Sequence, residues 1–168
     1  FVTFEESPED ICKNVLGFGW DLAKWEAEGK WAFVDASMAD DSPSIETGEY
    51  DFGGLIARIE HAVKRVNAKR AVVDSLGAAF SQFLDSSTVR REIFRLVIAL
   101  KRLNLTALVT GERYEERGPI ARFGVEEFVC DNVVILRNVL EEEKRRRTIE
   151  VLKLRGGPPW AGGPRPPP

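Results

Sequence analysis

The first ten residues, Phe-Val-Thr-Phe-Glu-Glu-Ser-Pro-Glu-Asp (residues 1–10), decide the fold class because they join a strand to a helix. Phe1–Phe4 is an uncharged, mostly apolar run, which is typical of a strand buried on both faces. Ser7 is followed by a proline and two acids, which predicts a helix with Ser7 as its N-cap. A strand that leads straight into a helix indicates an α/β protein. Because this strand opens the chain without a methionine, we also expect that an earlier element is missing.

Strands and helices continue to alternate as far as residue 110. Further strands are predicted at Trp31–Asp35, Arg70–Asp74 and Leu105–Thr110. Apolar residues at helical spacing predict helices over residues 11–16, 21–28, 55–66 and 89–103. Asn132–Val139 and Arg147–Leu154 then alternate like the two strands of a hairpin around a charged turn. The sequence therefore predicts a mostly parallel sheet flanked by helices, with an antiparallel hairpin at one edge.

Composition places these elements in one globular domain, residues 1–156, followed by a tail, residues 157–168. The tail holds six of the nine prolines, so we expect it to be disordered. A net charge of −3 argues against a nucleic-acid partner, since phosphate binding favours basic proteins. Cys12 and Cys130 are far apart and are expected to be free thiols, which indicates the cytoplasm. No stretch is long and apolar enough to span a membrane, and His61 is expected to be a surface or packing residue.

Glu5 and Glu6 are the first candidate catalytic residues, because they follow a buried strand directly. Ligands of open parallel sheets bind at the carboxyl ends of the strands. One carboxylate there could accept a proton from an attacking water while its neighbour orients that water. Position alone favours the alternative, in which both are solvated acids that interact favourably with the dipole of the following helix.

Asp74 and Ser75 form the second candidate, at the end of the predicted strand Arg70–Asp74. An apolar strand that ends in aspartate has the general form of a Walker B element, whose acid holds a water of Mg²⁺. A strand-ending turn with Asp74 as a helix cap is the alternative.

Lys153 and Arg155 form the third candidate, since strand alternation places them on one face, about 7 Å apart. Two cations there could neutralise a transferring phosphoryl group, or could simply be solvated. A phosphate-binding G-x-x-x-x-G-K-[ST] loop does not occur anywhere in the sequence.

Long runs of the sequence resemble the N-terminal ATPase lobe of the KaiC family, the circadian-clock ATPases of the RecA-like superfamily. The resemblance covers Phe1 to Gly156. The runs that carry it are residues 1–10, Phe-Gly-Trp-Asp-Leu (18–22), Val-Asp-Ser (73–75), residues 87–96, 117–129, Asp-Asn-Val-Val-Ile-Leu-Arg (131–137) and residues 145–156.

The resemblance implies a RecA-like P-loop NTPase core whose N-terminal phosphate-loop unit is missing from this chain. It implies hexameric rings with ATP and Mg²⁺ at each subunit interface. Glu5 and Glu6 match the paired catalytic glutamates, and Asp74 matches the Walker B acid that holds Mg²⁺ through water. Leu152, Lys153 and Arg155 match residues that reach the neighbouring subunit's nucleotide.

Partners implied by the resemblance are KaiB-like and KaiA-like clock proteins, with KaiB docking around Gly48–Phe52. Ser/Thr kinase activity would belong only to a full-length protein with the second lobe. Without the phosphate loop, we expect little ATP hydrolysis by this chain alone.

Two other functions are compatible with these features. One is a non-catalytic module that forms rings and docks partners. The other is a RecA-type DNA-binding protein, which would use the loop Glu112–Gly124. That loop carries three arginines balanced by three acids, so it has no net charge and DNA binding is disfavoured.

Overall fold

The computed structural model describes residues 1–37, 52–79, 86–112, 129–141 and 143–156. Four parallel strands form a sheet in the order β2-β1-β3-β4. They are β1 (Val2–Thr3), β2 (Val34–Asp35), β3 (Arg70–Asp74) and β4 (Thr106–Val109). The predicted mostly parallel sheet is thus confirmed, and every described pair in it is parallel.

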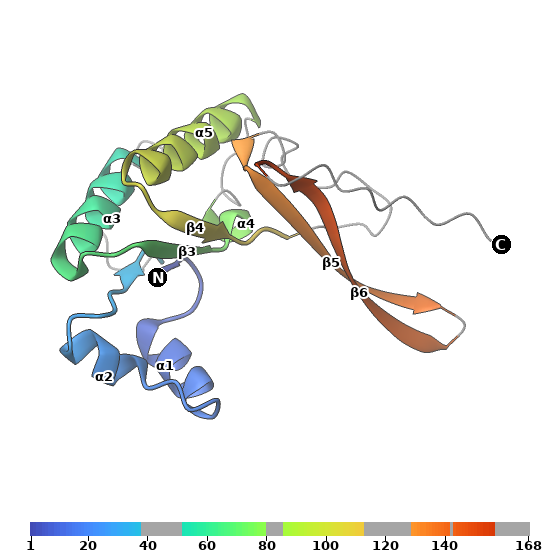
Figure 1. Ribbon diagram of the computed structural model, residues 1–168, viewed down its shortest axis with the longest axis horizontal. Coiled ribbons are helices and arrows are strands. Elements are labelled where there is room, and N and C mark those ends of the chain that lie inside the picture. Colours follow the sequence, from blue (N-terminus) through green and yellow to red (C-terminus); the bar gives the residue numbers. More distant parts are fainter. Residues whose placement is uncertain (38–51, 80–85, 113–128, 142, 157–168) are drawn as a thin grey trace.

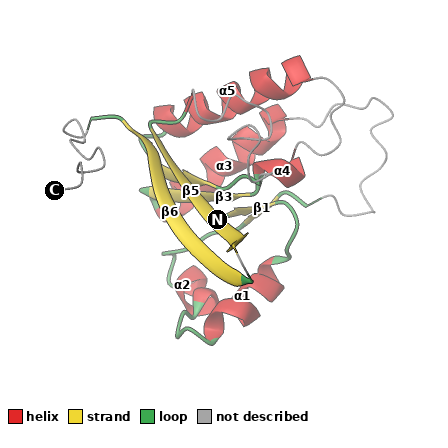
Figure 2. Cartoon of the chain, turned by 90° about the vertical axis from the view of Figure 1, so that its right-hand side faces the viewer, coloured by secondary structure: helices red, strands yellow, loops and turns green. Residues whose placement is uncertain are grey.

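Helices flank this sheet on two sides, as Figure 2 shows. They are α1 (Pro8–Leu16), α2 (Leu22–Ala27), α3 (Phe52–Val66), α4 (Leu76–Ala79) and α5 (Ser86–Arg102). In this view α1 and α2 lie below the sheet, while α3 and α5 lie above it. The short helix α4, which follows Asp74 and Ser75, was not predicted from the sequence.

The core lies between the sheet and the helices α3 and α5. All three elements contribute residues that are at most 2% exposed to solvent: Phe52 of α3, Ile93 and Leu96 of α5, and Val73 of β3. Both helices repeat buried apolar residues every three or four positions, which turns one stripe of each helix toward the sheet. These helices therefore hold β3 rigidly in the middle of the molecule.

The first two strands are shorter than predicted. Three aromatic residues pack together next to the short ladder between β1 and β2. The rings of Trp31 and Phe33 lie 5.7 Å apart between centroids, and both contact Phe1. Backbone hydrogen bonds continue the pairing on either side, from Val34 N to Phe1 O at 2.8 Å and from Ala36 N to Thr3 O at 2.7 Å.

The predicted hairpin is confirmed, but it forms a two-stranded sheet of its own. Its strands, β5 (Asn132–Glu141) and β6 (Lys144–Leu154), run longer than the sequence indicated and extend away from the rest of the chain in Figure 1. The longer strands leave a tight turn in which Glu143 has a φ of 67°. The ladder between β5 and β6 changes register between Val133 and Val134.

Several predictions lie outside the described residues. These are the tail from residue 157, residues 113–124 of the proposed DNA loop, and residues 48–51 of the proposed KaiB-docking segment. Within the described part, no helix is long and apolar enough to cross a membrane.

Candidate functional site

The carboxyl ends of β1 and β3 meet at one edge of the parallel sheet. Thr3 pairs with Asp74 in the ladder, and the next backbone N–H, that of Phe4, donates to the carbonyl oxygen of Asp74 at 3.1 Å. Glu5 and Glu6 follow at once and are exposed. The structure therefore brings the first two sequence-predicted site groups, the paired glutamates and Asp74, to adjacent strand ends.

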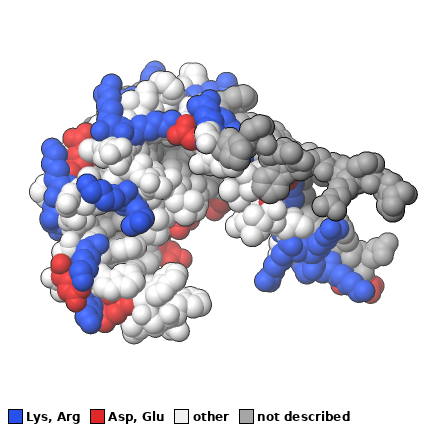
Figure 3. Space-filling view, viewed as in Figure 1, with Lys and Arg blue, Asp and Glu red and all other residues white. Residues whose placement is uncertain are grey.

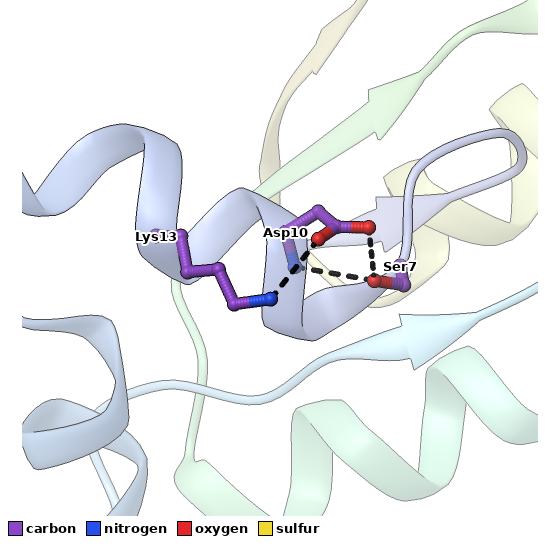
Figure 4. A network of polar contacts seen from close by, with 3 residues as sticks. All are labelled: Ser7, Asp10 and Lys13. Carbon is purple, nitrogen blue, oxygen red and sulfur yellow. Dashed lines mark hydrogen bonds and ion pairs between the residues drawn. The ribbon is translucent and has the colours of Figure 1, made fainter.

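The turn that carries the two glutamates is held from both sides. The buried Thr3 hydroxyl donates to the carbonyl oxygen of Glu6 at 2.7 Å. Ser7 then caps α1, because its Oγ accepts the backbone N–H of Asp10 at 3.1 Å (Figure 4). The predicted N-cap is confirmed, and it fixes where the chain leaves the site.

Ser7 and Lys13 also hold the carboxylate of Asp10. The Ser7 hydroxyl donates to Asp10 Oδ2 at 2.9 Å, and Lys13 Nζ lies 3.4 Å from Oδ1. The Ser7 hydrogen bond is the larger cause, with Lys13 second, that lowers the pKa of Asp10 below its usual value. The carboxylate of Asp10 is therefore held by contacts within the first turns of α1.

Asp74 has a neighbour that sequence reasoning missed. The Thr110 hydroxyl donates to Asp74 Oδ1, and the Thr110 N–H donates to the carbonyl oxygen of Val73 at 3.0 Å. Thr110 thus presents a hydroxyl at the end of β4, beside the carboxylate at the end of β3. A hydroxyl residue at the end of the predicted strand Leu105–Thr110 was the signal available in the sequence.

Ser75 lies directly behind this carboxylate and is buried. Its Oγ accepts the N–H of Ala78 at 3.4 Å, at the start of α4. The N–H of Leu76 donates to the Thr110 carbonyl at 3.1 Å. In the described structure Ser75 therefore has a helix-starting contact, and it supports the Asp74 turn from inside.

Arg155 is not brought to this edge of the sheet. Its backbone N–H donates to the carbonyl oxygen of Asp131 at 2.9 Å, and its Nη1 lies 3.5 Å from Asp131 Oδ1. Asp131 also pairs with Lys101 at 2.9 Å, in the last turn of α5. That turn leads into the amino end of β4, whereas Asp74 lies at the carboxyl edge. Arg155 is also one residue beyond the end of β6.

Leu152 and Lys153 lie on β6, shortly before Arg155. Lys153 is half-buried opposite Val133, and Leu152 sits at the register change with 41% of its surface exposed. Leu152, Lys153 and Arg155 thus lie on or next to the hairpin and not at the sheet edge of Asp74. If they contact the nucleotide of a neighbouring subunit, they do so from the hairpin.

Oxygen donors at the carboxyl edge fit a water-mediated magnesium site better than a fully protein-ligated one. Mg²⁺ prefers oxygen ligands and keeps several waters. Asp74 offers an exposed carboxylate oriented by Thr110. No group of three or more His, Cys, Asp or Glu among the described residues is arranged to hold a metal directly.

A family model of the ATPase domain of KaiC matches residues 1–159. This chain belongs to the KaiC ATPase family. It is 62% identical to the circadian clock protein KaiC3 of Synechocystis sp. over 156 residues. It is 56% identical over the same length to the circadian clock oscillator proteins KaiC of Thermostichus vulcanus and Synechococcus elongatus.

Each of these comparisons covers 93% of the chain but only 30–31% of the relative. The chain therefore spans less than a third of the KaiC relatives it matches. With its parallel sheet, flanking helices and antiparallel hairpin, it has the RecA-like fold expected for part of a KaiC ATPase domain.

Proposed function

We propose that this chain is part of a KaiC-like ATPase that binds ATP at the interfaces of a hexameric ring and hydrolyses it. The observation that carries the proposal is the ladder between β1 and β3, which sets Glu5 and Glu6 beside Asp74. Paired acids beside a Walker B aspartate are the groups that water activation and a magnesium ion require.

In this mechanism Glu5 or Glu6 accepts a proton from the water that attacks the γ-phosphorus, while the other glutamate orients it. Asp74, oriented by Thr110, would hold a water of Mg²⁺, which neutralises charge on the β- and γ-phosphates when bound. Lys153 and Arg155, with Leu152, would act on the ATP of the adjacent subunit. Ser75 supports the turn at which the nucleotide binds.

An exposed apolar face on the hairpin supports contact between copies. Val134 faces Val151 and Leu136 faces Ile149, and each of these four side chains is at least half exposed. Exposed apolar patches of this kind typically mark interaction surfaces. We place this assembly in the cytoplasm, where cysteines such as Cys12 and Cys130 stay reduced. KaiB-like and KaiA-like proteins are the partners proposed for the assembled ring.

A chimera tests the proposal, in which residues 1–156 replace the matching segment of the KaiC of Synechococcus elongatus. Changing Glu5→Gln with Glu6→Gln should lower the rate of phosphate release at least about 100-fold, because the base is lost. Glu9→Gln, an exposed acid in the first turn of α1, is the matched control and should leave the rate unchanged. Unchanged hydrolysis in the double variant would remove both glutamates from the mechanism.

A ring-forming module without turnover is the second candidate. The sequence contains no G-x-x-x-x-G-K-[ST] run, the loop that cradles the phosphates in P-loop NTPases, and this favours the second candidate for the 168-residue chain. Native mass spectrometry and a phosphate-release assay on the chain separate the two functions. Assembly without hydrolysis supports the module, and hydrolysis abolished by Glu5→Gln with Glu6→Gln supports the enzyme.

A further inference from the structure

A groove of about 370 Å³ lies between the edge strand β2 and the helix α3. Phe33 is among the residues of its strand wall, and Ala57 is among those of its helix wall. The volume is within the range of small-ligand sites. The groove is open to solvent, so a ligand could enter without movement of the backbone.

The helix wall of this groove is basic. Arg58, His61 and Arg65 all line it, at a spacing of three and four residues that places them on one face of α3. The single acid of α3, Glu60, is not among the lining residues. Figure 3 shows Lys and Arg side chains gathered over the part of the face where α3 lies.

Neither arginine is fully neutralised by its contacts. Arg58 Nη2 donates to the backbone carbonyl oxygen of Asp35, a neutral partner that leaves the guanidinium charge in place. Arg65 Nη2 lies 3.5 Å from Glu26 Oε1, and both side chains are about half exposed, so that pair is weak. Among the described residues, His61 makes no hydrogen bond or ion pair and is exposed.

The aromatic wall gives the groove a second kind of contact. Phe33 packs edge-on against Trp31 at a centroid distance of 5.7 Å and edge-on against Phe1 at 6.1 Å. Phe33 is half-buried, and it is one of the residues that line the groove. A ring fixed in this way offers a flat apolar surface next to guanidinium groups, which bind anions bidentately.

We propose that this groove between β2 and α3 binds a small organic anion that carries a flat ring. The anionic group would contact Arg58, Arg65 and His61, and the ring would lie against Phe33 and Ala57. The residues that line this site do not include Glu5, Glu6 or Asp74 of the proposed ATP site.

The chain contains a single histidine, so the imidazole signals of His61 report on the groove without further assignment. The experiment titrates phenyl phosphate into the 168-residue chain and follows the His61 ring protons by NMR at constant pH. We expect a saturable shift. Inorganic phosphate, which lacks the ring, should bind at least about fivefold more weakly, and phenol, which lacks the charge, should give no saturable shift.

Variants locate the binding. Arg65→Gln and Arg58→Gln should each weaken phenyl phosphate binding about tenfold, the loss expected for one charge-assisted contact. Lys64→Gln is the matched control, because Lys64 is exposed on the same helix but does not line the groove. Circular dichroism checks the fold, and if Arg58→Gln disturbs it, Arg65→Gln and Phe33→Leu carry the test.

A shift that stays linear in phenyl phosphate concentration would overturn the proposal. Equal weakening by Lys64→Gln and Arg65→Gln would overturn it too, because it would show a general response to charge. Inorganic phosphate that binds as tightly as phenyl phosphate would remove the ring from the ligand and refute the site as proposed.

Discussion

At the scale of single residues, the contact between Thr110 and Asp74 sets the geometry of the candidate site. Asp74 is exposed, and an exposed carboxylate turns freely unless a neighbour fixes it. The Thr110 hydroxyl supplies that neighbour, and its own backbone is fixed by hydrogen bonds to Val73 and from Leu76. The orientation of Asp74 is therefore decided by the end of a different strand.

Thr110→Val removes this hydroxyl with little change in shape. In the chimera, we expect the rate of ATP hydrolysis to fall about tenfold and the Mg²⁺ concentration for half-maximal rate to rise, since a hydrogen bond to a charged group is lost. Phosphate release measured across a range of Mg²⁺ concentrations checks this. Thr110→Ser, which keeps the hydroxyl, should retain the rate, and equal rates for Val and Ser would contradict this role.

The cap of α1 gives a second prediction at this scale. Ser7→Ala should lower the free energy of unfolding by about 1 kcal/mol, as loss of an N-cap does. It should also raise the pKa of Asp10, because the Ser7 hydrogen bond is the larger cause that lowers it. Urea unfolding and NMR titration of the Asp10 carboxyl measure the two effects. Ser7→Thr should preserve both, and an unaltered Asp10 pKa in Ser7→Ala would exclude the contact.

At the scale of elements, the hairpin is tied to the body through Asp131. This carboxylate precedes β5 and pairs with Lys101 of α5 and with Arg155 just after β6. The Lys101 hydrogen bond is the largest cause that lowers the pKa of Asp131, so the stabilisation it gives is present above the unfolded pKa and is lost as the pH falls.

Lys101→Met should raise the pKa of Asp131 more than Arg155→Met does, because the Lys101 contact is shorter and contributes first. Carbon-detected NMR titration of Asp131 gives both values. Glu150→Gln breaks the Arg137–Glu150 pair within the hairpin and serves as the control, which should leave Asp131 unaffected. A larger change from Arg155→Met would reverse the order of the two contacts.

The elements show what the sequence could predict and what it could not. Strand and helix types followed from local signals: the apolar run at Phe1–Phe4, the cap at Ser7 and the helical spacing of α3 and α5. The contact between Thr110 and Asp74 depends on the pairing of β3 with β4, which joins residues 36 positions apart in the sequence. The separation of the hairpin from the main sheet, and the place of Arg155, likewise depend on contacts distant in sequence.

At the scale of the whole chain, the buried amine of Phe1 couples the stability of the 168-residue chain to pH. The N-terminal amine of Phe1 donates to the carbonyl oxygen of Ala32 at 2.8 Å, beneath the aromatic cluster of Trp31 and Phe33. Burial lowers the pKa of this amine from 8.0 to about 6, and the more distant charge of Glu26 only partly opposes the change. The folded chain thus prefers the neutral amine.

The sign follows from which state binds the proton. Between pH 6 and pH 8 the unfolded chain carries more of the proton than the folded chain, so the free energy of unfolding rises with pH across this window. Above pH 8 the contribution is complete, and below pH 6 the folded state must charge a buried amine. A difference of two pKa units corresponds to about 2 kcal/mol once partial exposure is allowed for.

Acetylation of Phe1 isolates this effect, because the acetylated amide can still donate to Ala32 but no longer carries charge. We expect urea unfolding of the free-amine chain to show stability rising by about 2 kcal/mol between pH 6 and pH 8 beyond the change in the acetylated chain. Parallel curves for the two chains would mean that the amine is solvated in the folded state.

The amine lies where β1 meets β2, so a loss of stability at low pH should begin at this edge of the sheet. Hydrogen exchange measures this: the amides of Val34 and Ala36 should exchange faster at low pH before those of the buried strand β3 do.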